Sequence, residues 1–252
     1  MTEPIFYDAL ALPDEPGLTC LVGGGGKTSL MYRLGAELAA SCRSAVVTTT
    51  TRIGVPLPGQ ARFLDVRDFE DPEMHIRPGE VVCICRRDAG TKLSSPGCAI
   101  LPRLIASADR VISEADGARR LPVKAPNSHE PCIPPAADTV VAVAGLTALG
   151  KPLHTICFRC DLVCALLGAE PGDLLTPALL ARLLTHPLGQ FKEVGSVSRF
   201  RLLLNQADND RLLKLGLETA AIARTCLPGL RVVIGTLEPV PSVRGIVADT
   251  TV

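Results

Sequence analysis

The feature that most constrains this chain is an uninterrupted run of glycines between a short apolar segment and a helical pattern. The apolar segment, residues 18–22, has the length of one buried strand, and the glycines follow at positions 23 to 26. Glycine lets backbone N–H groups turn inward around an anion without a Cβ clash. Lys27 and two hydroxyl residues come next, where the helical pattern begins. This order predicts a phosphate-binding loop and not a glycine-rich turn with a surface lysine.

Each group in this loop has an expected role. Backbone N–H groups and the N-terminus of the next helix are expected to hold the phosphates. Lys27 would reach the terminal phosphates, and the hydroxyl of Thr28 would be a ligand of Mg²⁺. The residues expected to bind a nucleotide here are Gly23, Gly24, Gly25, Gly26, Lys27, Thr28 and Ser29.

The loop is two residues shorter than the common phosphate-binding pattern. That pattern has four residues between its first glycine and Gly-Lys, which would place the first glycine at Leu21. The sequence here reads G-x-x-G-K-T instead. It resembles the compact loop of the Mur ligase and folylpolyglutamate synthetase group, which implies a ligase or kinase that uses ATP to activate a small acid.

A second chemical pattern, Glu114-Ala115-Asp116-Gly117, follows the strand expected at residues 110–113. Phosphate-loop proteins need an acid at the tip of a strand beside the loop to hold Mg²⁺ or its waters, with a nearby glycine for the γ-phosphate. The spacing Glu114-x-x-Gly117 matches the D-x-x-G of GTPases with Glu for Asp, and Asp116 adds a second carboxylate. The expected metal ligands are therefore Thr28, Glu114 and Asp116.

Hydroxyl residues and an arginine, Thr48 to Arg52, end the strand expected at residues 45–47. Open α/β sheets bind ligands at the carboxyl ends of their strands. We therefore expect Thr50 and Arg52 to contact the nucleotide. The alternative is a β-branched extension of the strand that ends in a surface arginine.

The segment from Ala118 to Pro131 combines prolines with ionisable side chains. Proline restricts the backbone and excludes regular helix, so this segment is expected to be a rigid substrate loop. Lys124 could neutralise an anionic acceptor, and His129 could move a proton. The alternative is a solvated connection in which Lys124 and Glu130 form a surface ion pair. The candidate catalytic residues are Lys27, Glu114, Asp116, Lys124 and His129.

Asn205-Gln206-Ala207-Asp208 follows the strand expected at residues 201–204. GTPases carry N-K-x-D at such a strand end, and here Gln206 replaces the lysine. If the Asp208 carboxylate pairs with guanine, GTP would be preferred over ATP. Alternatively, Asn205 ends the strand and Asp208 caps the next helix. The expected cofactors are thus Mg²⁺ with ATP or GTP, bound in part by Asn205 and Asp208.

The alternation of buried strands and helices predicts a fold of the α/β class, P-loop NTPase-like, with a mostly parallel sheet and helices on both faces. A length of 252 residues suits a single P-loop domain over residues 1–252, with a helical insertion around 146–190.

Composition excludes several partners. Basic and acidic residues balance at 26 each, and aromatic residues make up 3%, which argues against nucleic-acid binding through general charge or base stacking. Apolar runs are too short to span a membrane. The start, Met-Thr-Glu-Pro, lacks the basic and apolar parts of a signal peptide. We expect a cytoplasmic protein with neither nucleic-acid nor membrane partners.

Ten cysteines in such a chain are expected to be reduced thiols. Cys83 and Cys85 fit a buried strand. Cys157, Cys160 and Cys164 would cluster on one face of a helix, where they could either bind a metal or an iron–sulfur cluster or pack as small apolar residues. Their leucine neighbours favour packing.

The ordered set of these motifs resembles the accessory proteins of selenium-dependent molybdenum hydroxylases, the YqeC-like family. The matching segments span most of the chain and are residues 22–28, 48–52, 114–117, 121–126, 129–131 and 205–208. The resemblance implies a P-loop nucleotide-binding protein linked to maturation of these hydroxylases. It also implies a molybdenum hydroxylase or its cofactor-assembly proteins as partners.

Three functions remain open at this point. The first is an Mg²⁺-dependent NTPase or nucleotide switch that helps to assemble or insert a cofactor, and it is the one we favour. The second is an ATP-dependent ligase or kinase acting on a small acid. The third is a non-catalytic chaperone whose nucleotide stabilises the fold. Three outcomes would distinguish them. Hydrolysis without another substrate would indicate the first, phosphate release only with an added acceptor the second, and tight nucleotide binding without turnover the third.

Overall fold

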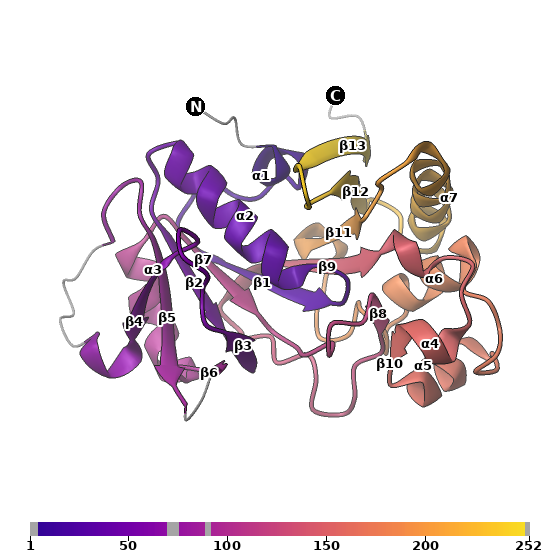
Figure 1. Ribbon diagram of the computed structural model, residues 1–252, viewed down its shortest axis with the longest axis horizontal. Coiled ribbons are helices and arrows are strands. Elements are labelled where there is room, and N and C mark those ends of the chain that lie inside the picture. Colours follow the sequence, from indigo (N-terminus) through magenta and orange to yellow (C-terminus); the bar gives the residue numbers. More distant parts are fainter. Residues whose placement is uncertain (1–4, 70–75, 89–91, 250–252) are drawn as a thin grey trace. The chain divides into compact units, whose positions relative to one another are not determined.

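The computed structural model describes residues 5–69, 76–88 and 92–249, in which strands and helices alternate along the chain (Figure 1). These residues divide into two compact units. Unit 1 takes its residues from 5–21, 28–117 and 132–139, and unit 2 takes its residues from 22–27, 118–131 and 140–249. Both units are of the α/β class, as the sequence predicted. The single P-loop domain stays a prediction.

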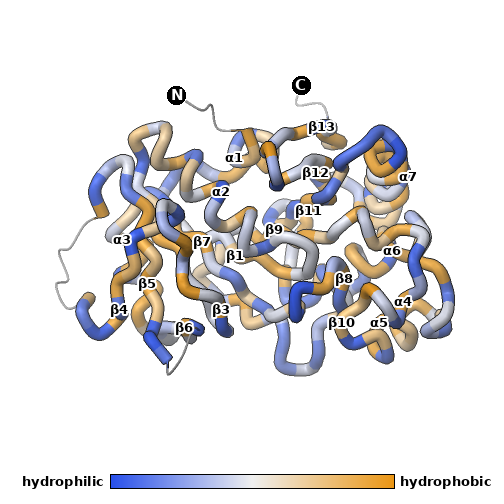
Figure 2. Tube along the Cα trace, in the orientation of Figure 1, coloured by the Kyte–Doolittle hydropathy of each residue, from blue (hydrophilic) through white to orange (hydrophobic). Residues whose placement is uncertain are grey.

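Unit 1 is built on parallel strands in the order β1, β7, β2 and β5. Their bounds are β1 (Leu18–Gly23), β7 (Arg110–Glu114), β2 (Ala45–Thr49) and β5 (Val81–Arg87). β1, β7 and β2 are buried along their whole length, which is typical of parallel strands covered on both faces. β4 (Arg62–Asp65) also pairs in parallel with β5, and Figure 2 shows hydrophobic residues along both strands.

The rest of this sheet in unit 1 is antiparallel and short. β6 (Lys92–Ser94) pairs with the end of β5, and β3 (Arg52–Gly54) pairs with β6. The sheet is therefore mixed, although the strands that form its buried part are parallel, as expected.

The long helix of this region is α2 (Lys27–Ala40), which crosses the strands of unit 1 in Figure 1. Leu30, Leu34 and Leu38 recur every four residues and are buried, so they form the apolar stripe of an amphipathic helix. α3 (Leu101–Ser107) tolerates its proline because Pro102 lies in the first turn, where no intrahelical N–H bond is lost. Short elements complete the unit: α1 (Phe6–Ala9), η1 (Val66–Asp68) and η2 (Cys98–Ile100).

One buried carboxylate attaches α1 to α2. Glu37 of α2 accepts hydrogen bonds from the backbone N–H groups of Phe6 and Tyr7, at 2.8–3.1 Å, and pairs with Arg33 at 2.6 Å. These N–H groups begin a helix that is too short to be stable alone. The sequence analysis did not predict α1, because a four-residue helix carries no period.

Unit 2 contains the parallel strands β9 (Ala137–Gly145, mainly in this unit), β11 (Phe200–Asn205) and β12 (Arg231–Thr236), with β11 in the middle. β13 (Ser242–Val247) pairs antiparallel with β12. α7 (Asp210–Cys226) connects β11 to β12, and η4 (Val197–Arg199) precedes β11.

Short helices dominate the region around residues 146–190. They are η3 (Leu146–Ala148), α4 (Leu153–Ile156), α5 (Cys160–Leu167) and α6 (Pro177–Thr185). Thr176 caps α6 by accepting the N–H of Leu179 at 3.2 Å, and Pro177 is the first helical residue. The region also contains β10 (Cys157–Phe158), which pairs in parallel with β8 (Val123–Lys124).

The cysteines are reduced, as predicted, but one of them lies in a different element from the one expected. All ten cysteines are free thiols, and Cys83 and Cys85 are fully buried in β5, as predicted. The placement of Cys157 on a helix was wrong, because it lies in β10, and the left-handed backbone of Arg159 separates it from α5. The helices in the described ranges include none that is both long and apolar enough to cross a membrane.

Candidate functional site

The glycine loop follows a backbone path that only glycine can take without strain. Gly23, Gly25 and Gly26 have φ angles of 94°, 71° and 131°. A Cβ on Gly25 would lie 2.4 Å from the backbone nitrogen of Gly145, and one on Gly23 would lie 2.3 Å from a backbone oxygen of β9. A side chain at either place would therefore require both an unfavourable φ and a movement of β9.

Two N–H groups of this loop bind protein carbonyls. Gly24 donates to Val143 at 2.9 Å, and Gly25 donates to Leu121 at 3.2 Å. These two N–H groups were expected to face an anion. In the structure they are occupied by protein carbonyls and fix the loop in place. The N–H groups in the first turn of α2, which begins at Lys27, point along the helix axis, as at the helix N-termini that bind anions in other proteins.

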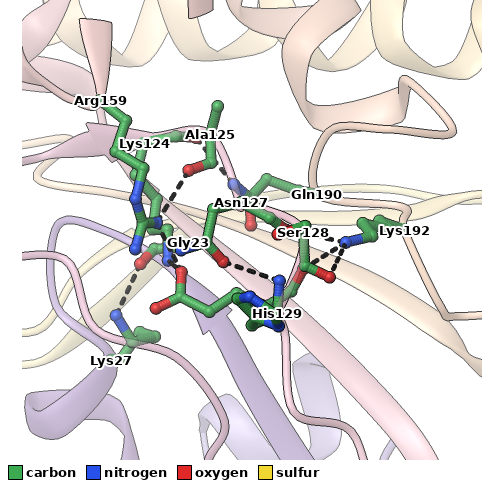
Figure 3. A network of polar contacts seen from close by, with 11 residues as sticks. Gly23, Lys27, Lys124, Ala125, Asn127, Ser128, His129, Arg159, Gln190 and Lys192 are labelled. Atoms are coloured by element: carbon green, nitrogen blue, oxygen red, sulfur yellow. Dashed lines mark hydrogen bonds and ion pairs between the residues drawn. The ribbon is translucent and has the colours of Figure 1, made fainter. Parts of the chain in front are cut away.

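Lys27 lies folded over the loop that precedes it. Its ammonium group donates to the carbonyl oxygen of Gly23 at 2.6 Å, and the residue is only 4% exposed (Figure 3). A buried ammonium group needs hydrogen-bond acceptors, and the curled loop supplies one. The side chain is thus held at the loop by a bond that a phosphate oxygen could replace.

Thr28 and Glu114 meet within unit 1. The Thr28 hydroxyl, in the first turn of α2, donates to Glu114 Oε2 at 2.7 Å. Glu114 ends β7 and lies in register with Leu21 of β1, so the parallel pairing brings the acid to the end of the strand that leads into the glycine loop. Asp116 is fully buried two residues later.

The donor set of this pair fits Mg²⁺. A hydroxyl and a carboxylate are the hard oxygen ligands that Mg²⁺ prefers, and this ion is usually held by one or two carboxylates together with substrate phosphates. Within residues 5–69, 76–88 and 92–249, no group of three or more His, Cys, Asp or Glu side chains could hold a metal. The pair therefore suits an ion shared with phosphates and not an all-protein cage.

The hydroxyl residues at the end of β2 bind backbone groups. Thr49 Oγ1 and the Thr50 N–H donate to the carbonyl oxygen of Glu114 at 2.8 and 3.0 Å, so they position that acid. Arg52 belongs to β3, where it pairs with Asp88 at 3.6 Å and its side chain is 70% exposed. The structure thus places Thr50 beside Glu114, whereas Arg52 pairs with Asp88, the residue that follows β5.

The proline-rich loop in unit 2 contains a buried ion-pair network (Figure 3). Glu130 accepts from Lys124 at 2.5 Å and from Arg159 at 2.6 Å, and the Lys124 side chain is fully buried. The alternative interpretation, a Lys124–Glu130 ion pair, has the right partners but is wrong about the surface. Burial raises the pKa of the Glu130 carboxyl, but hydrogen bonds from Arg159 and Lys124 outweigh burial and leave that pKa lowered.

Gln190 and Lys192, which were not predicted from the sequence, hold this loop in place by hydrogen bonds. Gln190 Nε2 donates to the carbonyl of Lys124 at 2.8 Å. The ammonium group of Lys192 donates at 2.7–3.3 Å to the carbonyl oxygens of Asn127, Ser128 and Glu130. His129 is exposed between these anchored groups. The loop is therefore rigid through distant hydrogen bonds as well as through its prolines, and no local motif could have indicated Gln190 or Lys192.

The lowered pKa of Glu130 leads to a pH prediction. Its contribution to stability is present above the carboxyl's unfolded pKa of about 4.3 and is lost as the pH falls through the lower folded value, because the unfolded chain then binds the extra proton first. We expect the difference in unfolding free energy between wild type and Glu130→Gln to shrink as the pH falls from about 6 to 3. Urea titrations at several pH values measure it, and a constant difference would contradict the ion pair.

Asn205 and Asp208 have separate partners. Asn205 ends β11, as predicted, and its side chain donates to the Gly25 carbonyl at 2.8 Å and accepts the N–H of Leu237 at 3.1 Å. Asp208 accepts from Thr236 at 2.7 Å. The interpretation of Asp208 as a helix cap was wrong, because Asn209 caps α7. Recognition of a base by Asp208 stays a prediction.

Within the part of the chain that the structure describes, Cys157, Cys160 and Cys164 do not form a group that could hold a metal ion. The sulfur atoms of Cys160 and Cys164 lie 3.7 Å apart on α5. Burial raises the pKa of Cys157 to about 12 and that of Cys164 to about 11, so both stay protonated at neutral pH. Cys157 is buried and packs as a small apolar residue, which agrees with the packing interpretation.

A family model and a similar protein sequence both relate this chain to the same family. A family model described as YqeC protein matches residues 19–161. A chain from Escherichia coli (strain K12), named uncharacterized protein YqeC, is 33% identical over 206 residues, which cover 78% of each chain. The range matched by the family model contains the glycine loop, the Thr28–Glu114 pair and the proline-rich loop.

Proposed function

The chain belongs to the YqeC family, and we propose that it binds a nucleoside triphosphate with Mg²⁺ and hydrolyses it, on a fold of the P-loop NTPase type. The observation that carries this proposal is the hydrogen bond from Thr28 to Glu114 at 2.7 Å. It joins a hydroxyl at the start of the helix after a glycine loop to an acid at a strand end, the pair that P-loop NTPases use to hold Mg²⁺.

In this proposal each residue has a defined task. The N–H groups at the start of α2 bind phosphate oxygens. Lys27 exchanges the carbonyl of Gly23 for the terminal phosphates. Thr28 and Glu114 would hold Mg²⁺, with Asp116 as the second candidate carboxylate, and the ion supplies positive charge to the phosphate oxygens. Asn205 keeps the loop in place through Gly25.

We also propose the cellular role that the motif resemblance implies, which is support of the maturation of selenium-dependent molybdenum hydroxylases. Its partners would be a hydroxylase or its cofactor-assembly proteins. Hydroxylase activity in a strain lacking this protein tests the role, with wild type and Lys27→Ala as the complementing genes. Unchanged hydroxylase activity in the deletion strain would refute the role without affecting nucleotide binding.

A ligase or kinase acting on a small acid is the second candidate, because the loop is two residues shorter than the common pattern. Phosphate release measured with and without carboxylic acids distinguishes this function from simple hydrolysis. Tight binding without phosphate release under either condition would indicate a non-catalytic nucleotide-binding chaperone.

Glu114→Gln tests the metal site directly. The amide keeps the shape of the side chain but removes a hard anionic ligand. We expect the Mg²⁺ concentration for half-maximal phosphate release to rise by about tenfold or more, which corresponds to about 1.4 kcal/mol. Glu218→Gln, on the exposed side of α7, is the matched control and should leave the Mg²⁺ profile unchanged. Identical profiles for wild type and Glu114→Gln would place the ion elsewhere.

A further inference from the structure

The proline-rich loop begins with a strained turn of two arginines. The N–H of Leu121 donates to the carbonyl of Ala118 at 2.9 Å, and the central residues Arg119 and Arg120 have φ angles of 49° and 64°. Turns with two left-handed central residues normally use glycine, asparagine or aspartate, because a longer side chain adds a steric cost. Such strain persists only where the surroundings enforce it, and it concentrates at functional sites.

This arginine turn adjoins the glycine loop within unit 2. Leu121, the last residue of the turn, accepts the N–H of Gly25 at 3.2 Å, and the next carbonyl, that of Pro122, accepts the N–H of Gly145 at 3.0 Å. A Cβ on Gly24 would lie 2.6 Å from the Leu121 oxygen. The turn is thus fixed directly against the loop.

The ring of Phe158 contacts Arg119 of this turn and also Arg159. The guanidinium carbon of Arg119 lies 5.0 Å from the ring centroid and that of Arg159 lies 4.4 Å from it, while the Lys124 ammonium group lies 5.9 Å away. Arg159 is itself left-handed, with φ of 60°. Stacking on one ring holds the cations near each other despite their repulsion.

Positive charge is in excess in the cluster formed by Arg119, Arg120, Lys124, Arg159 and Glu130. Its carboxylate, Glu130, is bonded to Lys124 and Arg159. Neither Arg119 nor Arg120 pairs with a carboxylate among the described residues, and both are exposed. The chain as a whole has no net charge, so this excess of positive charge is local.

We propose that Arg119 and Arg120 form an anion-binding site for phosphate or carboxylate oxygens. A guanidinium group binds two such oxygens in a fork geometry, and the Phe158 ring holds Arg119 beside the glycine loop. The anion is either the terminal phosphate of the nucleotide or an acidic group of a second substrate. Either source explains two exposed arginines held under strain beside a phosphate-binding loop.

The test uses glycine substitutions, because glycine adopts these φ angles without strain. The double variant Arg119→Gly/Arg120→Gly should keep or raise the melting temperature, while its affinity for inorganic phosphate, measured by calorimetry, should fall about tenfold or more. Glu193→Gly is the matched control, since Glu193 is also exposed and left-handed, with φ of 63°, and it should not change phosphate affinity. Repeating the series with Lys27→Ala separates phosphate bound by the arginines from phosphate bound by the glycine loop.

Nucleotide binding identifies the source of the anion. Weaker binding of the triphosphate with unchanged binding of the diphosphate would indicate the terminal phosphate. Normal triphosphate binding and turnover with weakened phosphate affinity would indicate a second, acidic substrate. The proposal is overturned if the folded double variant matches wild type for phosphate and nucleotides, or if wild type binds neither. Arginine-dependent phosphate binding without any nucleotide binding would refute the proposed function alone.

Discussion

Lys27→Ala is expected to raise the dissociation constant for nucleoside triphosphates about 100-fold or more, with the fold intact. The ammonium group is buried over the glycine loop, 2.6 Å from the Gly23 carbonyl, where water competes little with a bound phosphate. Hydrogen bonds to a charged group contribute about 1.5–3 kcal/mol each, and 100-fold corresponds to about 2.7 kcal/mol. Calorimetric titration with Mg²⁺ and ATP or GTP measures the change.

The matched control is Lys214→Ala, because Lys214 is an exposed lysine of α7 and removes the same charge from the chain. Its triphosphate affinity should equal that of wild type. Wild-type affinity in Lys27→Ala, with an unchanged circular dichroism spectrum, would refute the assignment of the phosphate-binding loop. Equal loss in both variants would mean that net charge and not position determines binding.

Asp138→Ala is expected to lower the free energy of unfolding by about 3 kcal/mol, because it leaves a buried guanidinium group without its carboxylate. Arg110 is fully buried and pairs with Asp138, and it also donates to Thr19 Oγ1 at 3.0 Å. Asp138 further accepts the N–H of Leu18 at 2.8 Å, at the start of β1. The Asp138 side chain is 36% exposed, so the expected loss of unfolding free energy is at the lower end of the range for breaking a buried ion pair.

A double variant separates the loss of a partner from the value of the pair. Arg110→Met with Asp138→Leu removes both charges and keeps most of the volume, so it should cost less than Asp138→Ala alone. Urea denaturation of the three proteins gives the free energies. If the double variant is the least stable, the pair itself stabilises unit 1, and the explanation by an uncompensated buried charge is wrong.

Elements with a local pattern were predicted well. The helix observed at residues 27–40 has leucines four residues apart, and the strand expected at 110–113 and observed at 110–114 has an apolar run before an acid. The cap of α6 also has a local signal, because a hydroxyl residue such as Thr176 before a proline is typical of a helix start. Errors occurred where neighbouring residues compete, as when Asn209 and not Asp208 capped α7.

The sequence by itself determined the glycine loop, its lysine and hydroxyl residues and the acid at the end of β7, because each depends on the spacing of adjacent residues or on φ angles that glycine permits. The partners of these groups were decided only by tertiary structure. Lys192 donates to carbonyl groups 62 to 65 residues away, and Arg110 forms an ion pair with a carboxylate 28 residues further on. Strand order and register create such contacts, and the hydrophobic periodicity of a segment records which face is buried but not which distant segment covers it.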